Sequence, residues 1–320
     1  MLLLRFALST VCVGVMVLGA SVVSGQDYPN KPIRLVTSGV GGGNDFVARL
    51  IAQGLTVSLG QQVIVDNRGS GTAPGQAVYQ APPDGYTLLM VSNNLWTGPL
   101  LYKAPYDPVR DFAPIALPTK APYILVVHPS LPVKSVKELI ALAKASPGEL
   151  NYSSTSTGSA SHIAGELFNY MAGVKIVRIS YKSSSQEAID LIGGQVQLTF
   201  FDAGTASRYM KARTVRALAV GSARPSALFP GLPTVAETVP GYEAKPQING
   251  VFAPARTPEA IIKRLNQEIV RVLNLQDVKE KLNNAGVEAV GGSPEQFAAE
   301  IESEIAIMSK VIKEAGIRVE

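Results

Sequence analysis

Cysteine and histidine are almost absent from this chain. Its 320 residues include one cysteine, Cys12, and two histidines, His128 and His162. Cys12 lies in an apolar segment that we expect to be removed, which excludes disulfides, thiol catalysis and thiolate zinc sites in the mature protein. Two histidines at this spacing, without cysteine, do not match the ligand pattern of a transition-metal site. We therefore expect neither a metal nor a cofactor.

Long runs of like charge are also absent. Charged residues make up 17% of the chain and the formal net charge is +4. Lysine and arginine do not cluster with interleaved aromatic residues, so nucleic acid is excluded as a partner. After the N-terminal segment no second apolar run is long enough to span a bilayer.

The first 25 residues have the pattern of a signal peptide. Arg5 supplies a positive charge, residues 6–20 are apolar, and Val23-Ser24-Gly25 provides residues suited to cleavage. A membrane anchor is the alternative, but the apolar run is short for a spanning helix. We expect cleavage after Gly25 and a soluble, monomeric periplasmic protein.

A glycine-rich turn at residues 38–45 joins an apolar strand, residues 33–37, to an amphipathic helix, residues 46–59. Such a turn presents backbone N–H groups at the start of a helix, where the helix dipole favours an anion. Asn44 or Asp45 is the expected N-cap. A dinucleotide fingerprint is the alternative, but Asn44 stands where its third glycine would be. The candidate ligand contacts here are Ser38, Gly39, Val40, Gly42, Asn44 and Asp45.

A second loop, residues 153–161, has a similar design with hydroxyl groups in place of most glycines. It precedes a helix, and we predict that the two loops face each other across a cleft and hold a small anion. The candidate contacts in it are Ser156, Thr157, Ser159 and Ser161. One alternative is a solvated turn that only caps the helix. Another is a hydrolase using Ser161 and His162, although no Gly-x-Ser-x-Gly elbow is present.

Strands and helices alternate along most of the chain. Residues 123–221 repeat the alternation of the first hundred residues, which predicts an α/β fold with parallel strands. Ligands bind at the carboxyl ends of such strands. Residues 99–122 are proline-rich and are expected to be irregular. The chain is expected to cross from a first domain to a second one after residue 122 and to return after residue 249. This predicts a discontinuous first domain, residues 26–122 and 250–320, and a second domain, residues 123–249.

Two further polar residues follow predicted strands. Asn93 comes after the strand at residues 87–91, and with Trp96 it either lines the cleft or packs in the core. Asp202 comes after the strand at residues 196–201, where it either accepts a hydrogen bond from the ligand or serves a hinge. A pair of acid–base carboxylates, Asp45 and Asp202, is a further alternative.

Several segments, in order along the chain, resemble those of a known family. They include Pro83-Asp84-Gly85-Tyr86-Thr87-Leu88, Tyr106-Asp107-Pro108-Val109-Arg110-Asp111-Phe112, Ser161-His162-Ile163-Ala164-Gly165-Glu166-Leu167, Gly193-Gly194-Gln195-Val196 and Phe252-Ala253-Pro254-Ala255-Arg256-Thr257-Pro258. The chain resembles the Bug-type periplasmic solute-binding proteins of tripartite tricarboxylate transporters. It departs from them in the first loop, where Ser38-Gly39-Val40-Gly41-Gly42-Gly43 replaces a proline-rich Phe-Pro-Pro-Gly-Gly stretch.

The resemblance implies a type II periplasmic binding-protein fold whose two α/β domains close on a small organic carboxylate. It implies delivery of that ligand to a membrane permease of one large and one small subunit, and no enzymatic activity. In the family, the loops equivalent to residues 38–45 and 156–161 hold the ligand carboxylate. A ligand sensor for a membrane signalling partner and a serine hydrolase are the alternative functions.

Overall fold

The computed structural model describes residues 28–69 and 71–314. The predicted signal peptide, residues 1–25, lies outside these residues. Within the described ranges, no helix combines the length and apolar character that crossing a membrane requires.

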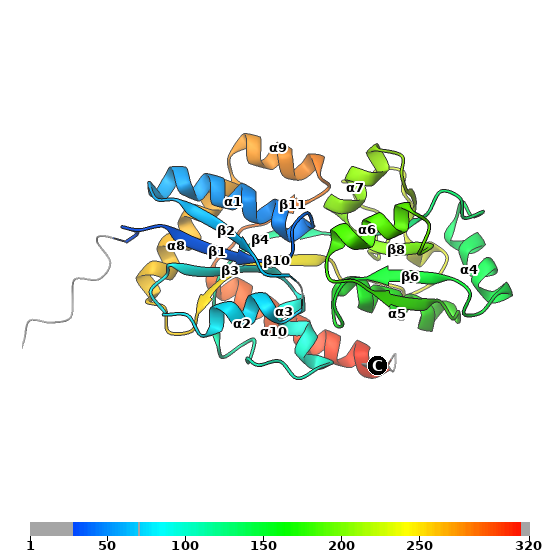
Figure 1. Cartoon of the computed structure of the whole chain (residues 1–320), viewed down its shortest axis with the longest axis horizontal. Helices are drawn as coiled ribbons and strands as arrows, with labels where there is room; N and C mark the ends of the chain where they lie inside the picture. The colour runs from blue at the N-terminus through cyan, green and yellow to red at the C-terminus, as the bar shows by residue number, and fades with distance from the viewer. Residues whose placement is uncertain (1–27, 70, 315–320) are drawn as a thin grey trace, which may run out of the picture.

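Two β-sheets with helices packed on them form the described chain (Figure 1). The six-stranded sheet has the order β11-β4-β10-β3-β1-β2, and the five-stranded sheet has the order β7-β6-β8-β5-β9. In the first, β1 pairs in parallel with β2 and β3; in the second, β6 pairs in parallel with β7 and β8. The strands are β1 (Ile33–Thr37), β2 (Val63–Asn67), β3 (Thr87–Ser92), β4 (Phe112–Ala121), β5 (Tyr123–Val127), β6 (Asn151–Ser154), β7 (Val177–Ser180), β8 (Leu198–Asp202), β9 (Arg216–Val220), β10 (Gln247–Pro254) and β11 (Glu288–Ala289).

Each sheet with its helices forms one lobe, and the two lobes lie side by side (Figure 1). The first lobe is the six-stranded sheet with α1 (Gly43–Leu59), α2 (Ala73–Tyr79), α3 (Asn94–Thr97), the 3-10 helix η1 (Gly98–Leu100), α8 (Glu259–Leu273), α9 (Gln276–Asn284) and α10 (Pro294–Glu314). The second lobe is the five-stranded sheet with α4 (Val136–Ala145), α5 (Ala160–Ala172), α6 (Ser184–Ile192), α7 (Ala203–Lys211) and the 3-10 helix η2 (Val235–Glu237).

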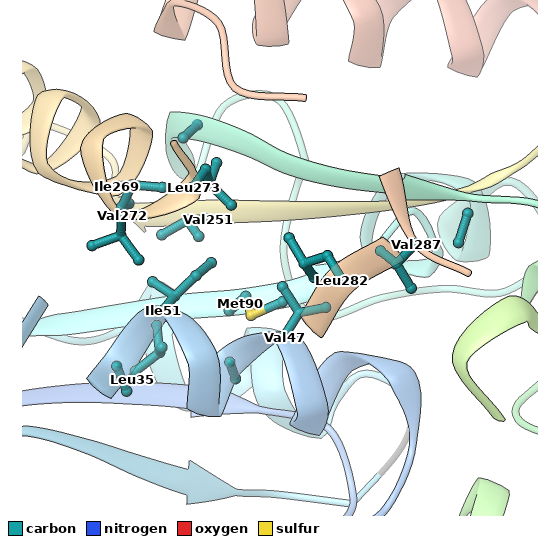
Figure 2. Close-up of a cluster of buried hydrophobic side chains, with 14 of the residues drawn as sticks. Leu35, Val47, Ile51, Met90, Val251, Ile269, Val272, Leu273, Leu282 and Val287 are labelled. Atoms are coloured by element: carbon teal, nitrogen blue, oxygen red, sulfur yellow. The ribbon is translucent and has the colours of Figure 1, made fainter. Parts of the chain in front are cut away.

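Helices cover both faces of the first sheet. Alternate residues of its strands point to opposite faces, so each strand packs against helices on both sides. Leu35 and Met90 pack on one face with Val47 and Ile51 of α1 and Ile269 of α8 (Figure 2). The neighbouring residues of the same strands pack on the other face against α3 and α10, in a cluster that includes Val36, Leu89, Trp96 and Phe297. This sandwich holds the carboxyl ends of β1 and β3 in fixed positions.

The proline-rich stretch at residues 99–122 is more regular than predicted. It contains β4, Phe112–Ala121, which pairs with β10 on one side and β11 on the other. The expectation of irregular structure was wrong for these residues. Proline cannot donate to the ladder, yet it is tolerated at a bulge, and the β4–β10 register shifts within this strand. The carbonyl of Pro118 also still accepts a hydrogen bond, from the Val290 N–H at 2.9 Å.

The chain passes between the lobes at the end of β4 and again before β10. β4 ends at Ala121 and β5 begins at Tyr123, so the predicted boundary at 122/123 falls between them. The predicted boundary at 249/250 falls inside β10, which begins at Gln247. The division into domains at these residues stays a prediction.

Candidate functional site

A cavity lies between the lobes, at the carboxyl ends of strands from both sheets. The space between the lobes here is about 840 Å³, open solvent at its mouth included. The loops after β1, β3, β6 and β7 and the end of β8 all contribute residues to its lining. The cavity therefore lies where the strand order predicted a ligand site.

Eight of the twelve predicted site residues line this cavity. They are Ser38, Gly39, Gly42 and Asn44 from the first lobe, and Ser156, Ser159, Ser161 and Asp202 from the second lobe. The structure thus brings the two loops, which are separated by more than a hundred residues in the sequence, to one enclosed space.

The other four predicted residues are not among the described residues that line the cavity. Val40 is 60% exposed, and its carbonyl accepts a hydrogen bond from the Ser185 hydroxyl at 2.9 Å. Asp45 accepts from the Gly41 N–H and from Asn67, and it forms an ion pair with Arg49. These contacts hold the first loop in shape from the side away from the cavity.

The side chains of Asn93 and Thr157 likewise form hydrogen bonds with other residues of the same chain. Asn93 Nδ2 donates to Glu304 Oε1 at 2.6 Å, and Trp96 Nε1 donates to the other oxygen of the same carboxylate at 2.9 Å. Both side chains are buried, so Trp96 packs in the core, which was one of its two predicted roles. Thr157 Oγ1 accepts from Arg178 Nη1 at 3.1 Å.

Helix α1 begins earlier than predicted. Gly42 is its N-cap and makes no side-chain hydrogen bond, so the expectation that Asn44 or Asp45 caps the helix was wrong. The physical reason is that the Asp45 carboxylate, in the first turn, reaches back to the Gly41 N–H at 3.0 Å. As a result the helix starts at Gly42 and Gly43, which line the cavity. N–H groups at the start of a helix have no partner within it, so those of the two glycines are available to a ligand.

The second loop caps α5 through Ser159. Ser159 Oγ accepts from the His162 N–H at 3.3 Å and lies 3.1 Å from Ser161 Oγ. The ring of His162 turns back to the loop, where Nδ1 accepts from the Gly158 N–H at 3.1 Å. Ser161 and His162 therefore do not form the nucleophile–base pair that a hydrolase requires.

Burial lowers the pKa of His162 to about 3, helped by the nearby charge of Arg178. The side chain is 2% exposed, so the ring is neutral in the folded protein at physiological pH. A neutral ring is needed here, because Nδ1 must accept a hydrogen bond.

We expect acid to destabilise the fold through His162. The unfolded chain binds a proton at this residue near pH 6.5, whereas the folded chain does so only near pH 3. The neutral His162 ring thus contributes fully to the free energy of unfolding above pH 6.5, and this contribution is lost as the pH falls towards 3. At pH 5 the loss is about 2 kcal/mol. Urea denaturation at pH 7.5 and pH 5 should show this extra loss in the natural protein relative to His162→Gln. An equal pH dependence in both would contradict it.

Arg178 on β7 holds the second loop from behind. Its guanidinium donates to Ser154 Oγ at 2.7 Å, to the Thr155 carbonyl at 2.9 Å and to Thr157 Oγ1 at 3.1 Å. The sequence contains no signal for this role, because Arg178 lies 17 residues beyond the end of the loop at residue 161 and has the pattern of an ordinary strand residue.

A third helix start reaches the cavity and was not predicted to do so. Ser183 is the N-cap of α6, and Ser183 and Ser184 line the cavity beside the starts of α1 and α5. Three helix N-termini thus face one space, each favouring negative charge. Of the described residues in the lining, Lys182 is the one cation, and its side chain is exposed. Attraction for an anion therefore comes mainly from backbone N–H groups and hydroxyls.

The lobes touch around the cavity. Asn94 Nδ2 lies 3.4 Å from Ser156 Oγ, and Thr97 Oγ1 lies 3.2 Å from the Gly158 carbonyl. On the other side Arg208 donates to the Gly41 carbonyl at 3.2 Å. Met308 of α10 and Ile163 of α5 form a further hydrophobic contact between the lobes. This is a closed arrangement, with each lobe supplying part of the enclosure.

Comparison with known proteins assigns this fold to a family. The family described as "Tripartite tricarboxylate transporter family receptor" (TctC) matches residues 47–317, and these include the second loop, both crossings between the lobes and α10. The chain belongs to the TctC family. The predicted family is confirmed. Protein BugT of Bordetella pertussis is 35% identical over 306 residues, covering 93% of this chain and 94% of BugT.

Solved structures of TctC relatives have the same fold. Rpa4515 of R. palustris, solved with adipate, is 37% identical with a TM-score of 0.88, over 91% of this chain and 99% of Rpa4515. MatC of Rhodopseudomonas palustris, with bound malate, is 28% identical with a TM-score of 0.85, over 89% of this chain and all of MatC. The periplasmic binding protein BugD is 29% identical with a TM-score of 0.87, over 92% of this chain and all of BugD.

These likenesses confirm the predicted α/β fold of a periplasmic binding protein. As a TctC protein, the chain is a periplasmic solute-binding protein, and its structural relatives are named for binding and transport and not for catalysis.

Proposed function

We propose that this protein captures a small organic carboxylate in the cavity between its lobes and delivers it to a membrane permease of one large and one small subunit. One observation carries the proposal: two donor-rich loops, one from each lobe, line the same closed cavity. Neutral donors and helix N-termini bind carboxylates well and allow release, because they add no full opposite charge. The adipate and malate bound to Rpa4515 and MatC support this ligand class.

The proposed carboxylate contacts are six of the predicted residues in the lining, together with the neighbouring Gly43. Backbone N–H groups of Gly42 and Gly43 and the side chains of Ser38 and Asn44 serve from the first lobe. Ser156, Ser159 and Ser161 serve from the second lobe. Since the ligand contacts both lobes only when they are closed, binding shifts the population towards the closed form.

Transport fits a protein that is exported, works as a monomer and has no catalytic activity. We place the hinge in the two crossings, with residues 26–122 and 250–320 moving as one domain and residues 123–249 as the other. Export through cleavage of residues 1–25 would bring the mature chain to the periplasm.

A thermal-shift screen of organic acids tests the proposal. A ligand at 100 times its dissociation constant adds about 2.7 kcal/mol to the free energy of unfolding, which should raise the melting temperature by roughly 5 °C or more. The matched controls are the neutral amides of the same acids, which should have no effect. If mono-, di- and tricarboxylates with four to eight carbons all leave the melting temperature unchanged, the proposed function is wrong.

A further inference from the structure

One residue in the cavity does not suit a simple anion. Glu187, in the first turn of α6, lines the cavity and is 2% exposed. Its Oε1 atom lies 3.0 Å from Ser153 Oγ and 2.5 Å from Thr199 Oγ1. Both hydroxyls belong to strands beneath the cavity, so one oxygen of the carboxyl is held in place by the sheet.

The Thr199 contacts are compatible with a protonated Glu187 carboxyl. Thr199 Oγ1 is also 2.8 Å from the Ser153 carbonyl, which can only accept. A hydroxyl has one hydrogen, so Thr199 Oγ1 donates either to Glu187 Oε1 or to the Ser153 carbonyl, and in the second case a protonated Glu187 can donate to Thr199. Burial favours the protonated form, since it raises the pKa of Glu187 to about 7, while the Thr199 and Ser153 hydroxyls oppose this shift.

The second oxygen, Oε2, is available to accept a hydrogen bond from a ligand, because Glu187 lines the cavity. Among the described residues, both hydroxyl partners of Glu187 bind Oε1 and neither binds Oε2. This holds in either protonation state, because an ionised carboxylate oxygen also only accepts.

Asp202 adds a second acceptor to the lining. It is 8% exposed and uses Oδ1 to accept from the Thr205 N–H at 3.0 Å as the N-cap of α7. The lining thus combines the donors of the two loops with two carboxyl acceptors, Glu187 and Asp202.

We infer that the ligand is a carboxylate that also carries a hydrogen-bond donor, a hydroxyl or an ammonium group, which binds Glu187 Oε2 and Asp202 while the carboxylate binds the loops. This inference rests on the proposed function. An acid without such a group would leave buried acceptor oxygens without partners in the closed cavity. Sites built around a hydrogen bond reject analogues that lack the bonding group.

Matched acids of equal chain length test the inference by titration calorimetry on the purified protein. The four-carbon set is succinate, malate and aspartate, and the five- and six-carbon sets carry the same substituents at the second carbon. In the best-binding set we expect the hydroxy or amino acid to bind at least about 10-fold more tightly than the unsubstituted acid. Comparing malate with aspartate distinguishes a hydroxyl from an ammonium ligand.

Two variants locate the preference at Glu187. Glu187→Met removes the acceptor at similar volume and should reduce the preference to less than about 3-fold. Glu187→Gln keeps an oxygen for the cavity and a donor for Thr199, so it should retain most of the preference. Asp190→Asn, on the same helix outside the lining, is the control and should leave it unchanged.

The outcomes separate the two claims. If unsubstituted acids bind as tightly as their hydroxy and amino counterparts at every chain length, the inference is overturned and the proposed function stands. If no carboxylate binds, the proposed function fails as well. The comparison in the natural protein decides the matter even if Glu187→Met does not fold.

Discussion

Replacing Gly158 with alanine should weaken binding of the organic acid by about 100-fold while the protein remains folded. Gly158 has φ of +76°, and an added Cβ would lie 2.7 Å from the Cα of Gly98 in the other lobe. Backbone cannot move aside as a flexible side chain can, so the closed form is penalised. A penalty of about 3 kcal/mol, typical of overpacking, corresponds to this loss of affinity. We expect an open form to lack this contact, because Gly98 and Gly158 belong to different lobes.

The matched control is Gly148→Ala. Gly148 also has positive φ, +84°, but an added Cβ would meet nothing within 4 Å. Both substitutions incur the backbone cost of a left-handed conformation, about 1 kcal/mol. Only Gly158→Ala should change the dissociation constant measured by calorimetry. Equal affinities in the two variants would show that closure at this contact is not needed for binding.

Replacing Glu304 with alanine should lower the free energy of unfolding by about 3 kcal/mol. The Glu304 side chain, 5% exposed, accepts from Asn93 Nδ2 at 2.6 Å and from Trp96 Nε1 at 2.9 Å. Trp96 Nε1 would be left without its partner at a cost of about 1–3 kcal/mol, and Asn93 Nδ2 would keep only the Pro246 carbonyl at 3.3 Å. Burial raises the pKa of Glu304 and the two donors oppose that shift. The carboxyl thus joins α10 to the start of α3, directly behind the cavity.

Glu302→Ala on the same helix is the control for this experiment. Glu302 is exposed, and its loss should change stability by less than about 0.5 kcal/mol. Urea denaturation monitored by circular dichroism compares the two. Glu304→Gln keeps one acceptor and should lose roughly half as much as Glu304→Ala. A loss in Glu304→Ala no larger than in Glu302→Ala would mean that Asn93 and Trp96 find other partners.

The strand–turn–helix at the start of the chain was predictable from its local pattern. Residues 33–37 form β1 as expected, and Gly60 ends α1 in the left-handed conformation with φ of +68°. The same logic, a polar loop after a strand, placed Ser156 and Asp202 at the cavity. These predictions succeeded because strand direction alone brings the carboxyl ends of parallel strands together.

Side-chain partners from distant parts of the chain were not predictable. Asn93 also follows a strand, but it turns to Glu304, which lies 211 residues further along. Glu187 reads as a polar position on an amphipathic helix, and only the folded positions of Ser153 and Thr199 show that it is buried at the cavity. Local patterns indicate where a loop lies in the fold, but they do not say which of its side chains faces the ligand.

Calorimetric titration of Asn44→Ala and Ser156→Ala with an acid found in the thermal screen tests the two-loop account most directly. Each variant removes one polar side chain from one lobe, and each is expected to weaken binding by roughly 10-fold or more, the loss of a charge-assisted hydrogen bond. Val40→Ala and Thr157→Ser, which keeps the hydroxyl that binds Arg178, are the controls from the same two loops but outside the lining, and should bind as the natural protein does. If Asn44→Ala and Ser156→Ala both bind with unchanged affinity, the two loops do not hold the carboxylate and the account is wrong.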